Sequence, residues 1–255
     1  MEANKSPRTV QAVQTALDII EYLQDVESAG VTELADEIGR SKGTIHSHLV
    51  TLVQNHYLTK EDDKYQLSLR YLDLGETIKN RIGFYGVIRD ELDDLAAESG
   101  ELAQIATEEH GQAVYLYKAR GENAVESASS VGKREYPHCI SLGKAILAYL
   151  PQERIEEIIE QSELVQYTSQ TITTREELLN ELEQIRDQGY AFDNEEKIAG
   201  LKCVAAPVID PDGRVLGALS ISGPSSRMTG ERFADELPEM VTRSANVIEI
   251  NAKFS

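Results

Sequence analysis

Residues 41–52 read SKGTIHSHLVTL, and this stretch decides the predicted fold of the first third of the chain. Ile45, Leu49 and Leu52 recur at helical spacing, which predicts one buried stripe. Ser41 is expected to cap the helix, because its hydroxyl can accept a hydrogen bond from a free backbone N–H. The outer face carries mostly small and polar residues, namely Lys42, Gly43, Thr44, His46, Ser47 and Thr51. Such a helix can enter the major groove of DNA.

The residues before this helix predict two further helices. Residues 10–24, VQAVQTALDIIEYLQ, place apolar side chains close to helical spacing. Residues 31–41, VTELADEIGRS, predict a shorter helix that Thr32 caps and Gly39 ends. A short helix, a tight turn and a second helix with a polar outer face are typical of a helix-turn-helix.

Residues 55–69, NHYLTKEDDKYQLSL, contain two alternating apolar runs around an Asp-Asp pair, which predicts a hairpin. The predicted inward face is formed by Tyr65, Leu67 and Leu69. Three helices and a hairpin make a winged helix-turn-helix over residues 1–69. A small helical packing module that binds no nucleic acid remains the alternative. The residues expected to contact DNA are Ser41, Lys42, Gly43, Thr44, Ser47, His48, Lys60 and Lys64.

The charge of the chain is unevenly spread. The formal net charge is −19 over 255 residues, but residues 1–83 hold 9 Lys/Arg against 13 Asp/Glu, whereas residues 84–255 hold 16 against 31. The near-neutral part therefore contains the predicted DNA reader. So strong an acidic excess is typical of a protein that stays soluble in a very salty cytoplasm, and an ordinary acidic bacterial protein is the alternative.

No apolar run of 18 residues and no secretory signal occur, so we expect a cytoplasmic protein without a membrane partner. The two cysteines cannot build a disulfide framework.

The rest of the chain predicts a linker helix over residues 70–83 and an α+β domain over residues 84–255. In that domain we expect a meander of strands with helices to one side, so that the sheet backs a pocket. The expected strands are residues 101–107, 113–119, 122–130, 201–209 and 214–222, and the expected helices are residues 88–99, 141–150, 173–189 and 229–252. Thr174 is expected to cap the third of these helices and Gly189 to end it.

The hairpin of residues 201–222 allows a prediction of strand register. A two- or four-residue loop sets Val204 opposite Leu219 and Cys203 opposite Ser220, so that one face is apolar throughout. A three-residue loop with a bulge at Gly213 would set Val204 against Ser220, a poorer apolar match. The first register is therefore preferred.

In this register Cys203, Ser220 and Ser222 share one face, and such small side chains cannot fill a core. They predict a small-ligand cavity. Asp193 follows a short predicted strand, and Ser141 begins a helix whose N-terminus favours an anion such as a carboxylate. The alternative is that these small residues lie beneath a packed helix, with each hydroxyl bonded to backbone.

The side chains of this region allow two further interpretations. His138, Cys139, Asp193 and Cys203 could be metal ligands, but no CxxC or HxxxH spacing supports a metal site. A cysteine nucleophile would need a base such as His138 or His110 within hydrogen-bond reach. The sequence therefore favours neither a metal, nor another cofactor, nor catalysis.

The chain resembles the IclR family of transcription regulators over roughly residues 8–250. The resemblance rests on residues 31–75, on PHCISLGKAILAYLP (137–151) and on GYAFDNEEKIAGLKCVAAPVIDPDGRVLGALSISGP (189–224). It implies a GAF-like effector-binding domain, a homodimer or dimer of dimers, and a small metabolite, often a carboxylate, as effector. In such regulators the ligand is held by residues that match Asp193, Cys203, Ser220 and Ser222. The acidity indicates a haloarchaeal member.

This chain departs from the family pattern at Asn55-His56, where a turn glycine is usual. The expected function is a ligand-responsive regulator of a catabolic pathway for a sugar or organic acid, with a double-stranded DNA operator as partner. Two alternatives remain open. One is an enzyme or metal-binding protein with a helical dimerisation module, and the other is an architectural DNA-binding protein without an effector.

Overall fold

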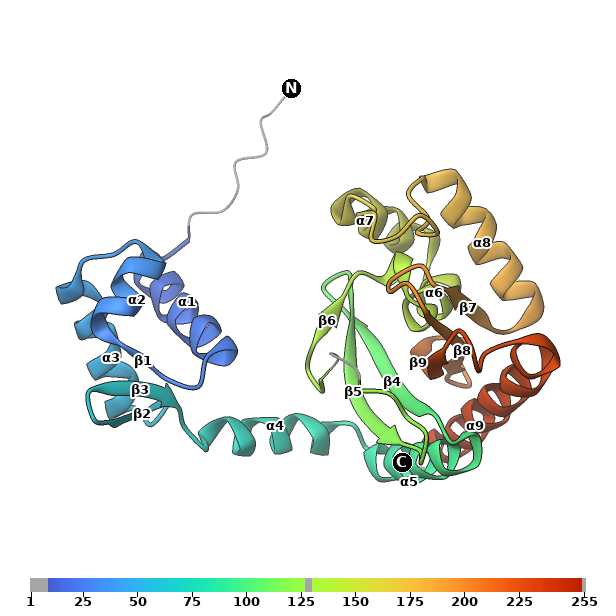
Figure 1. Ribbon diagram of the computed structural model, residues 1–255, viewed down its shortest axis with the longest axis horizontal. Coiled ribbons are helices and arrows are strands. Elements are labelled where there is room, and N and C mark those ends of the chain that lie inside the picture. Colours follow the sequence, from blue (N-terminus) through green and yellow to red (C-terminus); the bar gives the residue numbers. More distant parts are fainter. Residues whose placement is uncertain (1–8, 127–129, 254–255) are drawn as a thin grey trace. The chain divides into compact units, whose positions relative to one another are not determined.

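The computed structural model describes residues 9–126 and 130–253. Its contacts divide the chain into two compact units, Met1–Ile82 and Gly83–Ser255 (Figure 1). Each unit has its own hydrophobic core.

The first unit packs three helices against a small antiparallel sheet of strand order β1-β3-β2. Another helix, α4, follows the sheet. The elements are α1 (Gln11–Asp25), β1 (Ala29–Gly30), α2 (Val31–Ile38), α3 (Lys42–Gln54), β2 (Leu58–Glu61), β3 (Lys64–Leu67) and α4 (Arg70–Arg81). The expected winged helix-turn-helix architecture is therefore present.

Two local predictions in this unit were wrong. Thr32 does not cap α2, because Gly30 pairs with Lys64 in the sheet and the helix starts directly after it. Leu69 is 81% exposed, because the chain leaves the sheet after Leu67. The predicted first helix is present as α1, and its apolar side chains divide between two faces, with Ile19 and Leu23 in the core and Val13 and Leu17 exposed.

The turns on either side of α3 follow the sequence signals. Gly39 ends α2 in the left-handed conformation, at φ 68°. The Ser41 hydroxyl accepts a bond from the Thr44 N–H at 3.1 Å, which confirms the predicted cap. His56, which stands where a turn glycine is usual in the family, also has a positive φ of 63°. A non-glycine residue there carries some backbone strain.

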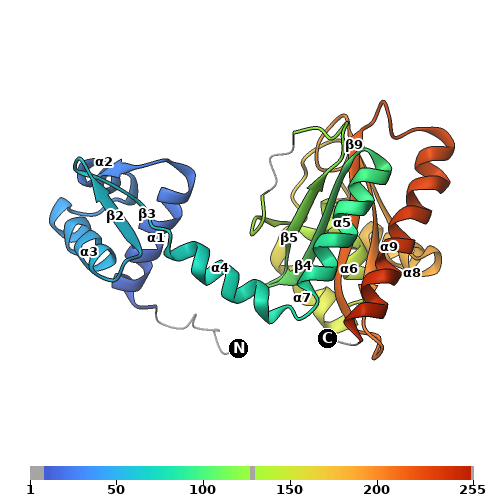
Figure 2. The same ribbon diagram turned by 90° about the horizontal axis from the view of Figure 1, so that it is seen from below.

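The second unit is built on a six-stranded antiparallel sheet of order β6-β5-β4-β9-β8-β7. Figure 2 labels β4, β5 and β9 of this sheet. The strands are β4 (Leu102–Glu109), β5 (Gln112–Arg120), β6 (Arg134–Glu135), β7 (Ala191–Asn194), β8 (Leu201–Ile209) and β9 (Val215–Pro224). The strand expected over residues 122–130 is absent from its described part, where residues 122–126 form a turn and coil, and residues 127–129 lie outside the described residues.

Helices cover both faces of this sheet, so the expectation of helices on one side was wrong. Figure 1 shows α5 and α9 on one side of the strands and α6, α7 and α8 on the other. Both faces of the central strands are buried: Ala205 packs with the α6 side, while the neighbouring Val204 on the opposite face is equally buried. The helices are α5 (Tyr85–Ser99), α6 (Ser141–Ala148), α7 (Gln152–Ser162), α8 (Arg175–Gln188) and α9 (Leu237–Ala252).

Two short helical turns precede α6 and α9, at Pro137–Cys139 and Arg232–Glu236. In α8, Thr174 caps the N-terminus by accepting from the Glu177 N–H, and Gly189 ends the helix at φ 86°. Both features of α8 were predicted correctly.

The register of β8 and β9 differs from the preferred prediction by two residues. Val204 lies opposite Ile221, and Cys203 lies opposite Ser222. Asp210 bonds to Arg214 across a three-residue loop that ends with Gly213 at φ 82°. A three-residue loop belongs to the register that was not preferred, which differs from the preferred one by one residue. An additional bulge beside Ile209 shifts the register by a second residue. An even shift keeps every side chain on its predicted face.

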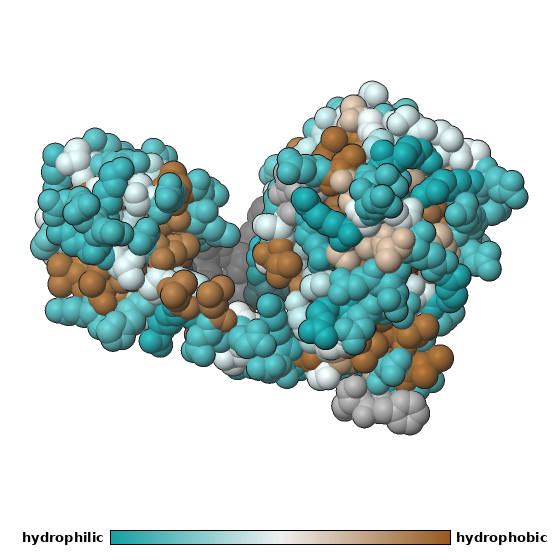
Figure 3. Space-filling model, turned by 60° about the horizontal axis from the view of Figure 1, so that its bottom comes forward, coloured by the Kyte–Doolittle hydropathy of each residue, from teal (hydrophilic) through white to brown (hydrophobic). Residues whose placement is uncertain are grey.

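The visible surface of both units is mainly hydrophilic, with separate apolar patches (Figure 3). Within residues 9–126 and 130–253, each helix is too short or too polar to span a lipid bilayer.

Candidate functional site

The residues predicted to contact DNA lie in two places in the first unit. Ser41, Lys42, Gly43, Thr44 and Ser47 are exposed on the first turns of α3, and His48 is half-buried. Lys60 and Lys64 are exposed on the β2–β3 hairpin. The Lys60 ammonium pairs with the Asp63 carboxylate at 2.6 Å. The Lys60 ammonium would have to leave that carboxylate before it could contact a phosphate. Lys64 is therefore the better placed of the two lysines for a phosphate contact.

Apart from Lys42, the exposed residues at the start of α3 have small side chains, namely Ser41, Gly43 and Thr44. Gly43 has no neighbour closer than the Ser41 hydroxyl, at 3.9 Å from where a Cβ would stand. The Ser47 hydroxyl bonds back to the Gly43 carbonyl at 3.0 Å. Small side chains at these positions let the helix approach base edges closely, which favours a recognition helix.

The second unit contains a cavity of about 330 Å³ on the α6 side of the sheet. All five residues predicted to bind an effector line it: Ser141, Asp193, Cys203, Ser220 and Ser222. Several other lining residues were not predicted from the sequence, among them Gln104, Tyr115, Lys133, Glu135 and Lys197. Gln104 pairs with Ser220 across β4 and β9, so a correct strand order would have identified it.

Strand pairing gathers the small polar side chains of the cavity. Cys203 on β8 lies between Asp193 on β7 and Ser222 on β9. Ser220 lies two residues from Ser222, on the same face. The Ser220 hydroxyl is buried, and none of the described residues forms a hydrogen bond with it. Such an unpaired hydroxyl carries a desolvation cost that a bound polar group could relieve.

Asp193 lies within β7, and not after it as predicted, and its side chain is only 2% exposed. Its carboxylate accepts from the Glu196 N–H at 2.8 Å. Burial, helped by the negative charge of Glu196, raises the pKa of Asp193 to about 7. The group can therefore donate a proton as well as accept one near neutral pH.

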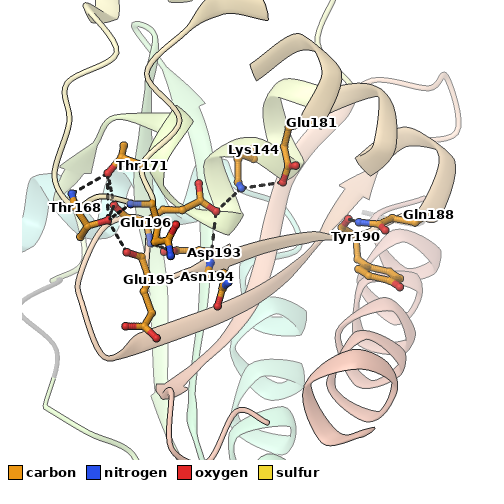
Figure 4. Close-up of polar contacts among 11 residues, drawn as sticks. Lys144, Thr168, Thr171, Glu181, Gln188, Tyr190, Asp193, Asn194, Glu195 and Glu196 are labelled. Carbon is orange, nitrogen blue, oxygen red and sulfur yellow. Dashed lines mark hydrogen bonds and ion pairs between the residues drawn. The ribbon is translucent and has the colours of Figure 1, made fainter. Parts of the chain in front are cut away.

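A buried ion cluster lies beside Asp193 (Figure 4). The Lys144 ammonium, from α6, contacts the Glu196 carboxylate at 2.6 Å and the Glu181 carboxylate of α8 at 2.9 Å. Thr168 and Thr171 donate hydrogen bonds to the Glu196 carbonyl, at 3.2 and 2.6 Å. The Lys144 contact ties the loop between β7 and β8 to α6, and the threonine bonds tie it to the segment between α7 and α8.

The N-terminus of α6 opens onto the cavity. Ser141 and Leu142 line it, and the first N–H groups of a helix have no intrahelical partner. A Cβ at Gly143 would lie 2.3 Å from the Pro137 backbone, so the helix start can pack this closely on the preceding turn only with glycine. The first turn of α6 is thereby held in place at the cavity wall.

The buried thiols are poorly suited to nucleophilic chemistry. Burial raises the pKa of Cys139 to about 12 and that of Cys203 well above its ordinary value, so both remain protonated near neutral pH. In the described part of the chain, no cluster of three or more His, Cys, Asp or Glu side chains could hold a metal ion.

Comparisons with known proteins agree with both units. Residues 12–62 match the IclR helix-turn-helix domain, and residues 80–250 match the bacterial transcriptional regulator IclR C-terminal domain. The chain belongs to the IclR family of transcriptional regulators. Members of this family are DNA-binding regulators and not enzymes, so the enzyme alternative is set aside for this IclR-family chain.

Several relatives match the IclR-family chain over nearly its full length. It is 33% identical to the probable transcriptional regulator ArcR of Halobacterium salinarum, covering 97% of this chain and 95% of the relative. It is 30% identical to the regulator KdgR of Dickeya chrysanthemi, covering 96% and 81%. The similarity to ArcR agrees with the haloarchaeal character inferred from the charge.

Solved structures match as well. The Thermotoga maritima IclR structure superposes with a TM-score of 0.79 at 27% identity, covering 95% of this chain and 98% of that one. An IclR homologue from Microbacterium hydrocarbonoxydans, solved in complex with 4-hydroxybenzoate, has a TM-score of 0.83 at 21% identity, covering 96% and 100%. The second match concerns the fold alone.

Proposed function

We propose that this regulator senses a small carboxylate metabolite in the cavity of its second unit and thereby controls operator binding by α3 and the β2–β3 hairpin. The regulated genes would belong to a catabolic pathway for a sugar or an organic acid. The main supporting observation is the buried Ser220 hydroxyl, which faces the cavity and has no hydrogen-bond partner among the described residues. A hydroxyl that served only the fold would be bonded to a neighbour.

The chemistry of the lining favours an acid that also carries a hydroxyl or keto oxygen. The ligand carboxylate would accept hydrogen bonds from the first N–H groups of α6, near Ser141. Its other oxygens would face Ser220 and Ser222. A pKa of about 7 lets Asp193 be neutral in part of the molecules at neutral pH, which reduces its repulsion of an anion. The homologue solved with 4-hydroxybenzoate also holds a hydroxylated carboxylate.

The apolar residues exposed on the first unit support a homo-oligomer. Val13 and Leu17 of α1 are 56% and 45% exposed, and Leu72 and Ile78 of α4 are 70% and 59% exposed. A second copy of the chain that covered these side chains would remove them from water. We therefore propose a homodimer, or a dimer of dimers, as the DNA-binding form.

The proposal is tested by titrating a panel of small hydroxy- and keto-acids into the full chain by calorimetry. Ser220→Ala should weaken binding of the acid that binds and leave the melting temperature unchanged or higher. Ser162→Ala is a matched control, because that buried hydroxyl bonds to the Ile159 carbonyl and lies outside the cavity. The same acid should alter a footprint of the protein on its operator. Wild-type affinity in Ser220→Ala would contradict a site at this hydroxyl.

A further inference from the structure

The short strand β6 directs alternate side chains to opposite sides. Glu135 pairs with Ala113 and Arg134 with Val114 at the edge of the sheet. Lys133 and Glu135 line the cavity, whereas Arg134 points away and pairs with Glu109. The Lys133 carbonyl accepts from the Tyr115 N–H at 3.1 Å, which holds this segment against β5. The sheet thus sets an acidic and a basic side chain side by side at the cavity wall.

The Glu135 carboxylate lies between two ammonium groups. One oxygen is 3.3 Å from Lys133 Nζ, and the other is 2.7 Å from Lys197 Nζ. Lys197 reaches this position from the loop between β7 and β8, on the other side of the cavity, and its ammonium stands 3.5 Å from the centre of the Tyr167 ring. Burial is the largest single influence on Lys197 and lowers its pKa, but the hydrogen bond and charge of Glu135 together with the neighbouring Cys139 and Tyr167 outweigh it, so the net shift of the pKa is upward. Lys197 is therefore a cation at neutral pH.

Two cations that converge on one carboxylate form a site for an acidic group. Among the described residues, Glu135 pairs with both of them, and its side chain is 13% exposed at the edge of the sheet. A ligand carboxylate could take its place in exchange for similar charge-assisted bonds, while Glu135 turns toward water. The other acidic residues of the lining are Glu126 and Asp193.

We propose that, without ligand, the Glu135 carboxylate occupies the position that a second acidic group of the effector takes when the effector binds. The cavity then selects small diacids over monoacids. One carboxylate of the diacid binds at the N-terminus of α6, and the other replaces Glu135 between Lys133 and Lys197. This inference rests on the proposed function, because it assigns the class of acid that the same cavity takes. Glu135 then acts as a specificity-determining residue, since a monoacid has no second group with which to displace it.

The test compares two probes of equal chain length, glutarate and pentanoate, by calorimetric titration of the full chain at one fixed KCl concentration. The wild type should prefer glutarate. Glu135→Gln removes the competing charge, and glutarate affinity should rise roughly fivefold to fiftyfold, the scale of one charge-assisted bond, with a smaller rise for pentanoate. Lys197→Gln should abolish the preference for glutarate.

Glu109→Gln is the matched control, because it removes a carboxylate from the neighbouring pair with Arg134 outside the cavity. It should leave both affinities unchanged. The inference is overturned if Glu135→Gln has a lower melting temperature than the wild type and binds glutarate no better. Glu135 would then serve to stabilise the fold through its two ion pairs. An equal gain for both acids also overturns it, because that gain reflects net charge alone.

The two proposals can fail separately. If pentanoate binds and glutarate has no advantage in the wild type or in Glu135→Gln, only the diacid inference is wrong. If neither glutarate nor pentanoate binds but an acid of the hydroxy- and keto-acid panel does, only the diacid inference is wrong. If no acid of that panel binds either, carboxylate sensing in this cavity is wrong as well.

Discussion

The ammonium group of Lys144 forms a 2.6 Å ion pair with the carboxylate of Glu196, and both side chains are buried. The pair joins α6, whose first residues line the cavity, to the loop that follows Asp193. Taking two charges out of water is costly, and only close geometry and added bonds repay that cost. The pair therefore positions two walls of the cavity relative to each other.

Lys144→Met should lower the free energy of unfolding by roughly 3 to 5 kcal/mol, because it leaves the Glu196 carboxylate buried without its cation. Urea denaturation at constant KCl and pH measures the change. The double variant Lys144→Met/Glu196→Gln should recover part of the loss, since no unpaired charge then remains at the centre of the cluster. A single variant as stable as the wild type would mean that solvent reaches this cluster.

Asp193 should make the stability of the protein depend on pH. Its pKa is about 7 in the folded protein against an ordinary value of 3.8, so the folded state binds the proton more tightly. The stabilisation is complete below about pH 3.8 and is lost as the pH rises to 7. Asp193→Asn removes this loss while keeping an acceptor for the Glu196 N–H.

Relative to the wild type, Asp193→Asn should therefore gain roughly 2 to 3 kcal/mol of unfolding free energy between pH 5 and pH 8. Paired denaturation curves at the two pH values provide the measurement. Glu196 also has a raised pKa, but it is present in both proteins and its titration largely cancels. A difference that stays constant with pH would show that Asp193 is ionised across this range.

The sequence predicted the composition of the cavity better than its exact geometry. The preferred β8–β9 register was wrong by two residues, yet Cys203, Ser220 and Ser222 still share one face. This agreement has a physical reason, since side chains alternate along a strand and an even shift leaves each on the same side. The loop bulges that cause the shift depend on backbone conformations near Gly213 and Ile209, which alternation of apolar residues does not specify.

The charged parts of the cavity could not be predicted in the same way. Lys144 lies in an otherwise apolar helix, and its partners come 37 and 52 residues later in the chain. Lys133 and Lys197 are brought together by the sheet edge and a loop that belong to distant strands. Local periodicity predicts which residues are buried. Only the tertiary fold determines which carboxylate pairs with each buried cation.

Replacement of Lys42 and Thr44 with alanine should weaken operator binding roughly tenfold to a hundredfold, because both lie exposed on the first turn of α3. The fold should survive, since the Ser41 hydroxyl still caps the Thr44 N–H of the backbone. Fluorescence anisotropy at matched salt measures the affinity. Thr51→Ala is the control, on the same helix but near its C-terminal end. Equal effects of the two variants would argue against docking of α3 by its N-terminal turns.

The stability of the protein should rise from dilute buffer to molar KCl. The net charge is −19, and the second unit holds 31 acidic against 16 basic residues, so its acidic side chains repel one another at low salt. At about 1 M salt the Debye length falls to roughly 3 Å, and most of this repulsion is screened. Thermal melts across a KCl series test this, and a Glu98→Gln variant offers a check. Glu98 pairs with Arg243 on the surface, so its removal should matter less as salt increases. A melting temperature that is flat or falls with KCl would contradict adaptation to a salty cytoplasm.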